Sequence, residues 1–274
     1  MYNTKCLKRQ LAIFILFTST ISFASCHGTH ISINHDYQLI KEKTFSISPG
    51  KELIVDASSG DVIVTYWNKS EVNVKISGND NAINNMEFSI EGDDESVKVS
   101  AKKKSSVSSW FSNIGLEIEI KVPSEFNVNV HTSGGDIKYG GVSGNAKLNT
   151  SGGDIWGEKF KGNLNISTSG GDISLIGSDA KIIAETSGGD IRLDYEGQNN
   201  GIDLSTSGGD IKIKLPEDFN ASLELSTSGG DVSCSLNLSN VQKLSDTKIV
   251  GDLNNGGEKL SAHTSGGDIS VRKK

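Results

Sequence analysis

The feature that most constrains this fold is a five-residue motif, Thr-Ser-Gly-Gly-Asp, which occurs seven times and is always followed by Ile or Val. Its aspartates are Asp136, Asp154, Asp172, Asp190, Asp210, Asp231 and Asp268, at successive intervals of 18, 18, 18, 20, 21 and 37 residues. A steady period indicates that each copy is one structural unit stacked on its neighbours. We interpret Ala57–Val62 and Gly251–Leu253 as degenerate copies, the latter dividing the long interval.

The residues that flank each motif alternate between apolar and polar. Two positions before the Thr stand the apolar residues Val130, Leu148, Ile166, Ala184, Leu204, Leu225 and Ala262, and a polar residue always follows them. After the Asp, the first position is Ile or Val, and the third is apolar in most copies. A period of two is typical of strands, so each repeat is predicted to hold two short strands joined by the Gly-rich turn.

These patterns predict an all-β fold, a β-solenoid resembling a parallel β-helix, with about 18–21 residues and two short strands per coil. Coils would stack ~4.8 Å apart, so that equivalent side chains lie above one another. We expect Gly-Gly to supply positive φ angles, Ser and Asp to accept bonds from turn amides, and stacked Thr hydroxyls to bond from coil to coil. The alternative fold is an antiparallel β-sandwich in which the Gly-Gly turns close hairpins.

The first 25 residues are predicted to be a secretory signal. Lys5, Lys8 and Arg9 precede an apolar run that begins at Leu11, a length that is short for a transmembrane helix. The run ends in Phe23-Ala-Ser-Cys26, which resembles the lipobox of bacterial lipoproteins. That resemblance implies that Cys26 is acylated and becomes the first mature residue. Cleavage near Ala24 with an unmodified Cys26 is the alternative.

The chain therefore divides into four expected parts: a signal peptide (1–25), a lipidated Cys and tether (26–43), an irregular N-terminal β portion (44–129) and the regular repeat solenoid (130–274). Without its signal, the chain holds two cysteines, Cys26 and Cys234, so a lipidated Cys26 leaves no internal disulfide. Removing the three signal cations changes the net charge from −7 to −10. Such an acidic body argues against nucleic acid as a partner.

Two segments carry a resemblance to a known family, residues 122–137 and residues 215–232, each of which runs from a Pro-containing stretch into the repeated turn. They resemble the bacterial "putative adhesin" family, a domain of unknown function with Gly-Gly-Asp repeats. The resemblance covers about residues 44–274. It implies surface binding at the cell envelope and no catalytic residues.

Three candidate sites follow from these residues. Cys26 is the candidate lipidation site. Six motif aspartates (Asp136, Asp154, Asp172, Asp190, Asp210 and Asp231) are candidate calcium ligands, because stacked carboxylates repel and a cation between coils would offset that repulsion. The alternative is that they are turn acceptors and the chain needs no cofactor. Trp110 and Phe111, in a Ser-rich loop, form the candidate contact patch.

These observations lead to one functional interpretation with alternatives. The chain is expected to be a non-catalytic, lipid-anchored lipoprotein of the outer membrane or cell surface, acting as an adhesin toward an unknown surface protein or glycan. A structural or signalling envelope component and a calcium-stabilised β-roll are the alternatives. A polysaccharide-acting enzyme is disfavoured because the chain has three Arg, one of them in the signal, and none of the common catalytic motifs.

Overall fold

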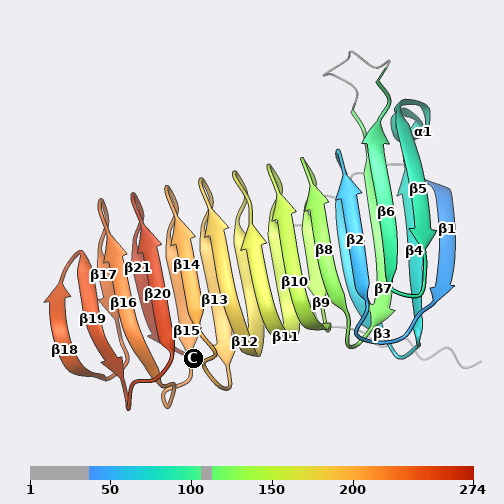
Figure 1. Ribbon diagram of the computed structural model, residues 1–274. Helices are drawn as coiled ribbons and strands as arrows, with labels where there is room; N and C mark the ends of the chain where they lie inside the picture. Colours follow the sequence, from blue (N-terminus) through green and yellow to red (C-terminus); the bar gives the residue numbers. More distant parts are fainter. Residues whose placement is uncertain (1–36, 106–112) are drawn as a thin grey trace, which may run out of the picture. The chain divides into compact units, whose positions relative to one another are not determined.

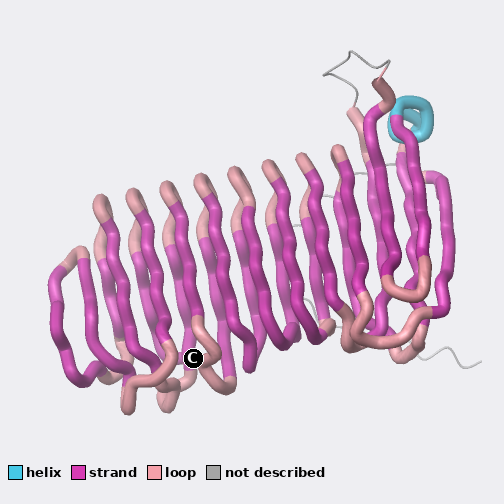
Figure 2. Tube along the Cα trace, in the orientation of Figure 1, coloured by secondary structure: helices cyan, strands magenta, loops and turns pink. Residues whose placement is uncertain are grey.

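The computed structural model describes residues 37–105 and 113–274, all of which belong to one compact unit, His35–Lys274. This unit is all-β, and its strands form one long sheet (Figures 1 and 2). The described strands are β1 (Gln38–Ser46), β2 (Glu52–Ala57), β3 (Asp61–Trp67), β4 (Glu71–Gly78), β5 (Met86–Gly92), β6 (Ser96–Lys103), β7 (Leu116–Pro123), β8 (Asn127–Thr132), β9 (Ile137–Gly140), β10 (Ser143–Thr150), β11 (Ile155–Ser167), β12 (Ile173–Thr186), β13 (Ile191–Glu196), β14 (Ile202–Thr206), β15 (Ile211–Leu215), β16 (Ala221–Thr227), β17 (Val232–Cys234), β18 (Leu238–Ser245), β19 (Lys248–Leu253), β20 (Lys259–Thr264) and β21 (Ile269–Lys273).

Each repeated turn joins a strand of one row to a strand of a second row. We call the two strands and their turn a rung. Strands that enter the turns pair in parallel in the order β6, β2, β8, β10, β11, β12, β14, β20 and β16. Strands that leave the turns pair in parallel in the order β7, β3, β9, β11, β12, β13, β15, β21 and β17. Strands β11 and β12 belong to both rows because each bends midway, at Lys159 (φ 52°) and Asp179 (φ 52°).

The register between rungs places equivalent residues opposite one another. In the entering row, Val130 lies opposite Leu148, and Leu148 lies opposite Ile166. In the leaving row, Ile137 lies opposite Ile155. All of these side chains are fully buried between the two rows. The alternation in the sequence therefore builds the core directly, and the antiparallel sandwich alternative is wrong for these strands, which pair in parallel.

The order of the rungs differs from the order of the chain at both ends. Near the C-terminus, β20 and β21 lie between the β14–β15 rung and the β16–β17 rung, although they follow β16 and β17 in sequence (Figure 1). Near the N-terminus, β2 and β3 lie one rung inside β6 and β7. Antiparallel strands flank the outermost rungs: β1, β4 and β5 at one end, and β18 and β19 at the other.

The interpretation of Gly251–Leu253 as a degenerate turn is wrong. These residues lie inside strand β19, where Gly251 pairs with Leu223 of β16 in antiparallel register. The 37-residue interval exists because β18 and β19 form a hairpin outside the β16–β17 rung before the chain returns. A Gly-Asp dipeptide without the Thr-Ser-Gly context is thus poor evidence for a turn.

One short helix, α1 (Asp80–Asn85), interrupts the strands of the described residues. Asn79 caps it, since the Asn79 side chain accepts a hydrogen bond from the Ala82 amide at 3.0 Å. Six residues are less than two turns, too few for helical periodicity to be visible in the sequence. In the described part of the chain, we find no helix that is long and apolar enough to cross a membrane.

Candidate binding groove

Three of the residues predicted to be functional lie outside the described residues. These are the lipidation candidate Cys26 and the contact-patch candidates Trp110 and Phe111. Lipidation at Cys26 and contact through Trp110 and Phe111 stay predictions.

The motif aspartates form a continuous hydrogen-bonded column along the turns. The Asp154 amide donates to Asp136 Oδ1 at 2.9 Å, and the Asp172 amide donates to Asp154 Oδ1 at 2.8 Å. The pattern continues from Asp190 to Asp172, Asp210 to Asp190, Asp268 to Asp210 and Asp231 to Asp268. Every motif carboxylate except that of Asp231 therefore accepts the turn amide of the next rung, as expected for turn acceptors.

The charge of this column is offset in part by neighbouring cations. Arg192 donates to Asp172 Oδ2 at 2.9 Å and to Asp190 Oδ2 at 2.7 Å, while Lys212 pairs with Asp210 at 3.0 Å. Among the described residues, no group of three or more His, Cys, Asp or Glu side chains is placed to hold a metal ion. Calcium binding by the six aspartates stays a prediction for titration.

The pKa values of the column vary with these neighbours. Burial acts to raise the pKa of Asp172, but the Asp190 amide and Arg192 outweigh it, so that the pKa lies below its ordinary value. The amide of Asp268 and the ammonium of Lys212 also lower the pKa of Asp210. The pKa of Asp136 shifts in the opposite direction. Burial raises it, and the nearby carboxylates of Asp61 and Asp154 add to that effect.

The Thr of each motif bonds from rung to rung, as expected. Thr168 Oγ1 donates to the Gly153 carbonyl of the preceding rung at 2.9 Å and accepts from the Gly171 amide of its own turn at 3.3 Å. The same contacts recur at Thr150 and Thr186. Every motif Thr is buried with its hydroxyl satisfied, so the column holds the turns in register.

The expected role of the paired glycines is wrong, because none of the motif glycines has a positive φ. The second Gly is required for a different reason. A Cβ at Gly153 would lie 2.0 Å from the Gly135 carbonyl oxygen, whereas a Cβ at Gly152 would meet nothing within 4 Å. Backbone-to-backbone stacking therefore excludes a side chain at the second position.

The two described tryptophans lie on the leaving row, away from the groove described next. Trp67 donates from Nε1 to the Glu71 carbonyl at 2.7 Å, and Lys69 lies 4.5 Å from the centre of its ring. Trp156 is 38% exposed, with Lys138 5.7 Å from the centre of its ring. Trp67 is therefore held by contacts with nearby residues, whereas the ring of Trp156 is partly exposed to solvent.

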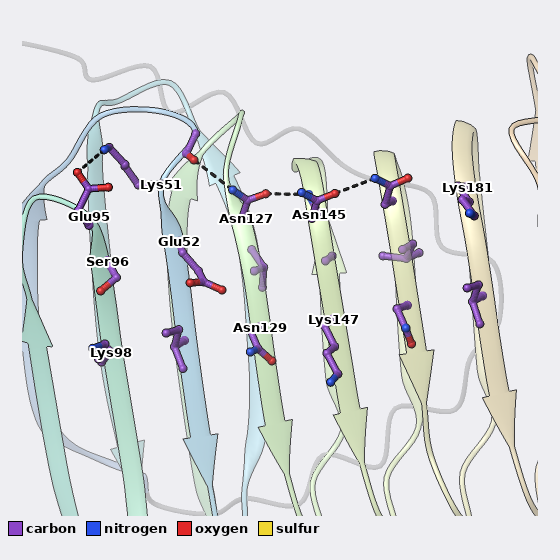
Figure 3. Close-up of a pocket in the computed structure, with 18 residues that line it drawn as sticks. Lys51, Glu52, Glu95, Ser96, Lys98, Asn127, Asn129, Asn145, Lys147 and Lys181 are labelled. Atoms are coloured by element: carbon purple, nitrogen blue, oxygen red, sulfur yellow. Dashed lines mark hydrogen bonds and ion pairs between the residues drawn. The ribbon is translucent and has the colours of Figure 1, made fainter.

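A groove of about 970 Å³ crosses the outer face of the entering row (Figure 3). It runs over strands β6, β2, β8, β10, β11 and β12, near the ends of these strands that lie opposite the Thr-Ser-Gly-Gly-Asp turns. Its polar lining consists of Lys51, Glu52, Glu95, Ser96, Lys98, Asn127, Asn129, Asn145, Lys147, Asn163, Asn165 and Lys181. The lining is thus rich in amides and ammonium groups.

Three asparagines form a row along one side of this groove. Asn163 Nδ2 donates to Asn145 Oδ1 at 2.8 Å, and Asn127 Oδ1 accepts from the backbone N–H of Asn145 at 3.0 Å. Asn127 Nδ2 donates in turn to the Gly50 carbonyl at 3.1 Å (Figure 3). The bonds fix the orientation of these side chains. Asn129 and Asn165, two residues further along their strands, add side-chain amides that bond to no described residue.

Glycines bring the strands of this row close together. Gly144 and Gly162 have φ of 144° and 102°, and a Cβ at Gly162 would lie 2.4 Å from the Gly144 carbonyl oxygen. Each directly precedes an asparagine of the hydrogen-bonded row, Asn145 or Asn163. The two glycines thus occupy equivalent positions in neighbouring strands, and the asparagine side chains that follow them lie directly opposite one another.

Four lysines and two glutamates give the groove a local excess of positive charge. Lys51 pairs with Glu95 at 2.6 Å. Lys98, Lys147 and Lys181 make no ion pair with any described residue, and all three are exposed. The whole chain, in contrast, has a net charge of −7.

This groove was not predicted from the sequence, although the sequence contains a signal for it. Asn127, Asn145 and Asn163 each lie five residues before a motif Thr, with Lys181 at the same place in the next repeat. Aligning the repeats over their whole length rather than near the turns would have revealed the column.

Comparisons with known proteins found similar chains among the solved structures. Matches among solved structures include a "putative cell adhesion protein" from Clostridium sporogenes (14% identity, 86% of this chain and 100% of that chain, TM-score 0.36) and a "putative adhesin" from Bacteroides fragilis (15%, 86% and 97%, TM-score 0.43). A "putative lipid binding protein" from Parabacteroides distasonis is similar at 14% identity over 88% of this chain and 98% of that one, with a TM-score of 0.30.

The curated proteins include no match to this chain. A family model, Toastrack DUF4097, matches residues 127–272, which span the seven motif copies and the strands that carry them. This match covers more than half of the 274 residues. The chain belongs to the Toastrack DUF4097 family.

Proposed function

We propose that this chain is a non-catalytic, extracytoplasmic β-solenoid that acts as an adhesin-type binding module, with the groove across the entering row as its contact surface. Lipidation at Cys26 would hold it at the cell envelope through the lipobox-like segment. The rungs provide a rigid frame, because Thr, Gly and Asp fix every turn to the next.

The observation that carries this proposal is the ordered row of amides in the groove. Asn127, Asn145 and Asn163 hold fixed orientations and repeat at the strand spacing of about 4.8 Å. An amide both donates and accepts hydrogen bonds, so a row of them suits a ligand with many hydroxyl groups. A glycan strand lying across the rungs would meet a similar polar group at each step.

The arrangement favours binding over catalysis. Most groove side chains that reach solvent are amides and ammonium groups on an open surface, with the carboxylates of Glu52 and Glu95 at one end. The motif aspartates, the largest set of aligned carboxylates, hold backbone amides at the turns instead. A structural or signalling role in the envelope is the alternative function.

The test uses the full chain in its own membranes. We would measure attachment of cells that display it to a panel of immobilised glycans, and compare the double variant Asn145→Ala, Asn163→Ala. The matched control is Ser174→Ala with Ser270→Ala on the leaving row. We expect attachment to a subset of glycans that falls at least fivefold in the Asn variant and is unchanged in the control.

Failure to attach to any glycan, in a strain whose envelope weakens when the chain is deleted, would favour the alternative role. Intact mass of the membrane-extracted protein, with Cys26→Ser as control, tests the anchor separately. A mass increment of acyl chains that is lost in the control supports lipidation at Cys26. An unmodified chain would remove the anchor from the proposal.

A further inference from the structure

We propose that the groove selects an acidic linear polysaccharide, one that bears carboxylate groups along its chain. This inference rests on the proposed function and goes further by naming the ligand class. Its starting point is the set of lysines Lys98, Lys147 and Lys181, which come from strands β6, β10 and β12 and are spread along the groove (Figure 3).

These lysines are available to a ligand. Lys51 is paired with Glu95, but no described acidic side chain pairs with Lys98, Lys147 or Lys181. On the outer face of the leaving row, Arg192 and Lys212 are paired with carboxylates, while Lys138 and Lys214 stand singly among the described residues and outside the groove. The groove thus has unmatched positive charge on a chain whose total charge is negative.

The spacing of these charges suits an extended chain that crosses the strands. Lys98 and Lys147 lie on one line that crosses the strands of the entering row. Ile54 and Asn129 of the two intervening strands lie between them on this line. Three strand spacings put their Cα atoms roughly 14 Å apart. Asn165 continues the same line beyond Lys147. A polymer along this line would alternate between contacts with lysine ammonium groups and contacts with amides.

Other polyanions fit this surface less well. Among the described residues that line the groove there is no aromatic side chain, and single-stranded nucleic acids usually bind through stacking on aromatic rings. An extended peptide usually binds to a free strand edge, whereas the strands under the groove are paired on both sides. Hydroxyls and carboxylates of an acidic polysaccharide match both kinds of side chain that the groove offers.

The experiment measures binding of the detergent-extracted full chain to polygalacturonate, dextran, an anionic phospholipid vesicle and oligothymidylate. The test variant is Lys147→Gln with Lys181→Gln. Its matched control, Lys103→Gln with Lys214→Gln, makes the same change in net charge at exposed lysines outside the groove. All four substitutions are at exposed positions, and melting curves would verify that both variants stay folded.

We expect the chain to bind polygalacturonate at least tenfold more tightly than dextran. The affinity for polygalacturonate should fall about tenfold in the test variant, less than twofold in the control, and steeply as salt rises. A Lys147→Arg, Lys181→Arg variant should retain most of the affinity, since the charge is kept.

Equal affinity for dextran, sensitive to Asn145→Ala with Asn163→Ala, would overturn the charge selection and leave the proposed glycan function standing. Tighter binding to vesicles or oligothymidylate, or an equal loss in the control variant, would also overturn it. Failure to bind any glycan would overturn both proposals.

Discussion

Asp136 and Asp154 are joined by a hydrogen bond of 2.9 Å in which the backbone amide of the later residue donates to the side chain of the earlier one. The two residues lie 18 positions apart in sequence and one rung apart in space. Because the same bond recurs between successive rungs, the aspartates align the turns rather than act as isolated surface charges. The turn chemistry therefore yields stability predictions.

Replacing Gly153 by Ala should destabilise the fold, and replacing Gly152 by Ala should not. The new methyl at residue 153 would meet the Gly135 carbonyl, while that at residue 152 points into open space. We expect the first change to cost at least about 1–3 kcal/mol and the second to alter stability by less than about 1 kcal/mol. Urea denaturation of both variants measures the difference, and equal stabilities would refute the stacking explanation.

The stability conferred by Arg192 should depend on pH. Asp172 has a lowered pKa in the folded state, so its contribution is present above the unfolded value of about 3.9 and is lost as pH falls through the folded pKa. We therefore expect Arg192→Gln to lower the Tm more at pH 7 than near pH 2. Asp136, with its raised pKa, has the opposite sign and offsets part of the acid loss.

The matched control for this experiment is Lys214→Gln, which removes an exposed cation outside the aspartate column. Its Tm loss should be small at both pH values. If Arg192→Gln lowered the Tm equally at the two pH values, packing of the arginine rather than its ion pairs would account for the loss.

Ile269 should behave as a central core residue although it lies near the end of the sequence. It pairs with Ile211 on one side and Val232 on the other, because its rung is inserted between two others. We expect Ile269→Ala to cost about 2–5 kcal/mol, as much as Ile173→Ala in the middle of the stack. Thermal and chemical denaturation measure both, and a loss below about 1 kcal/mol would place the last rung at the periphery.

Removal of calcium should leave the Tm unchanged. The Oδ1 atoms of all motif aspartates except Asp231 already accept backbone amides, and Arg192 and Lys212 supply cations to three of the carboxylates. Melting curves with a chelator and with millimolar calcium should superimpose. A rise of several degrees with calcium would instead establish the β-roll alternative.

Much of the architecture was predictable because the repeat unit is short and regular. Alternation around each turn identified the buried columns, such as Val130, Leu148 and Ile166, and the common period implied their stacking. What local pattern could not provide was the position of the last rung. Thr227–Asp231 and Thr264–Asp268 have the same sequence, so either could stack on the Asp210 turn.

The groove was harder to predict for a different reason. Asn145 and Lys147 look like ordinary solvent-facing residues within their own strand. Their meaning depends on the partners that the register brings alongside, Asn127 and Asn163 in particular. Cys26, Trp110 and Phe111 fall outside the described residues, so those predictions await measurement.

The inserted rung also affects the order in which the molecule can assemble. Strands β14 and β15 precede β16 and β17 in the chain, yet the two pairs are neighbours only through β20 and β21. A polypeptide that is made from the N-terminus onward cannot pair these strands until residues 259–273 have also been made. During folding, strands β20 and β21 would therefore complete this part of the two rows last among the described rungs, because they follow all the others in the chain.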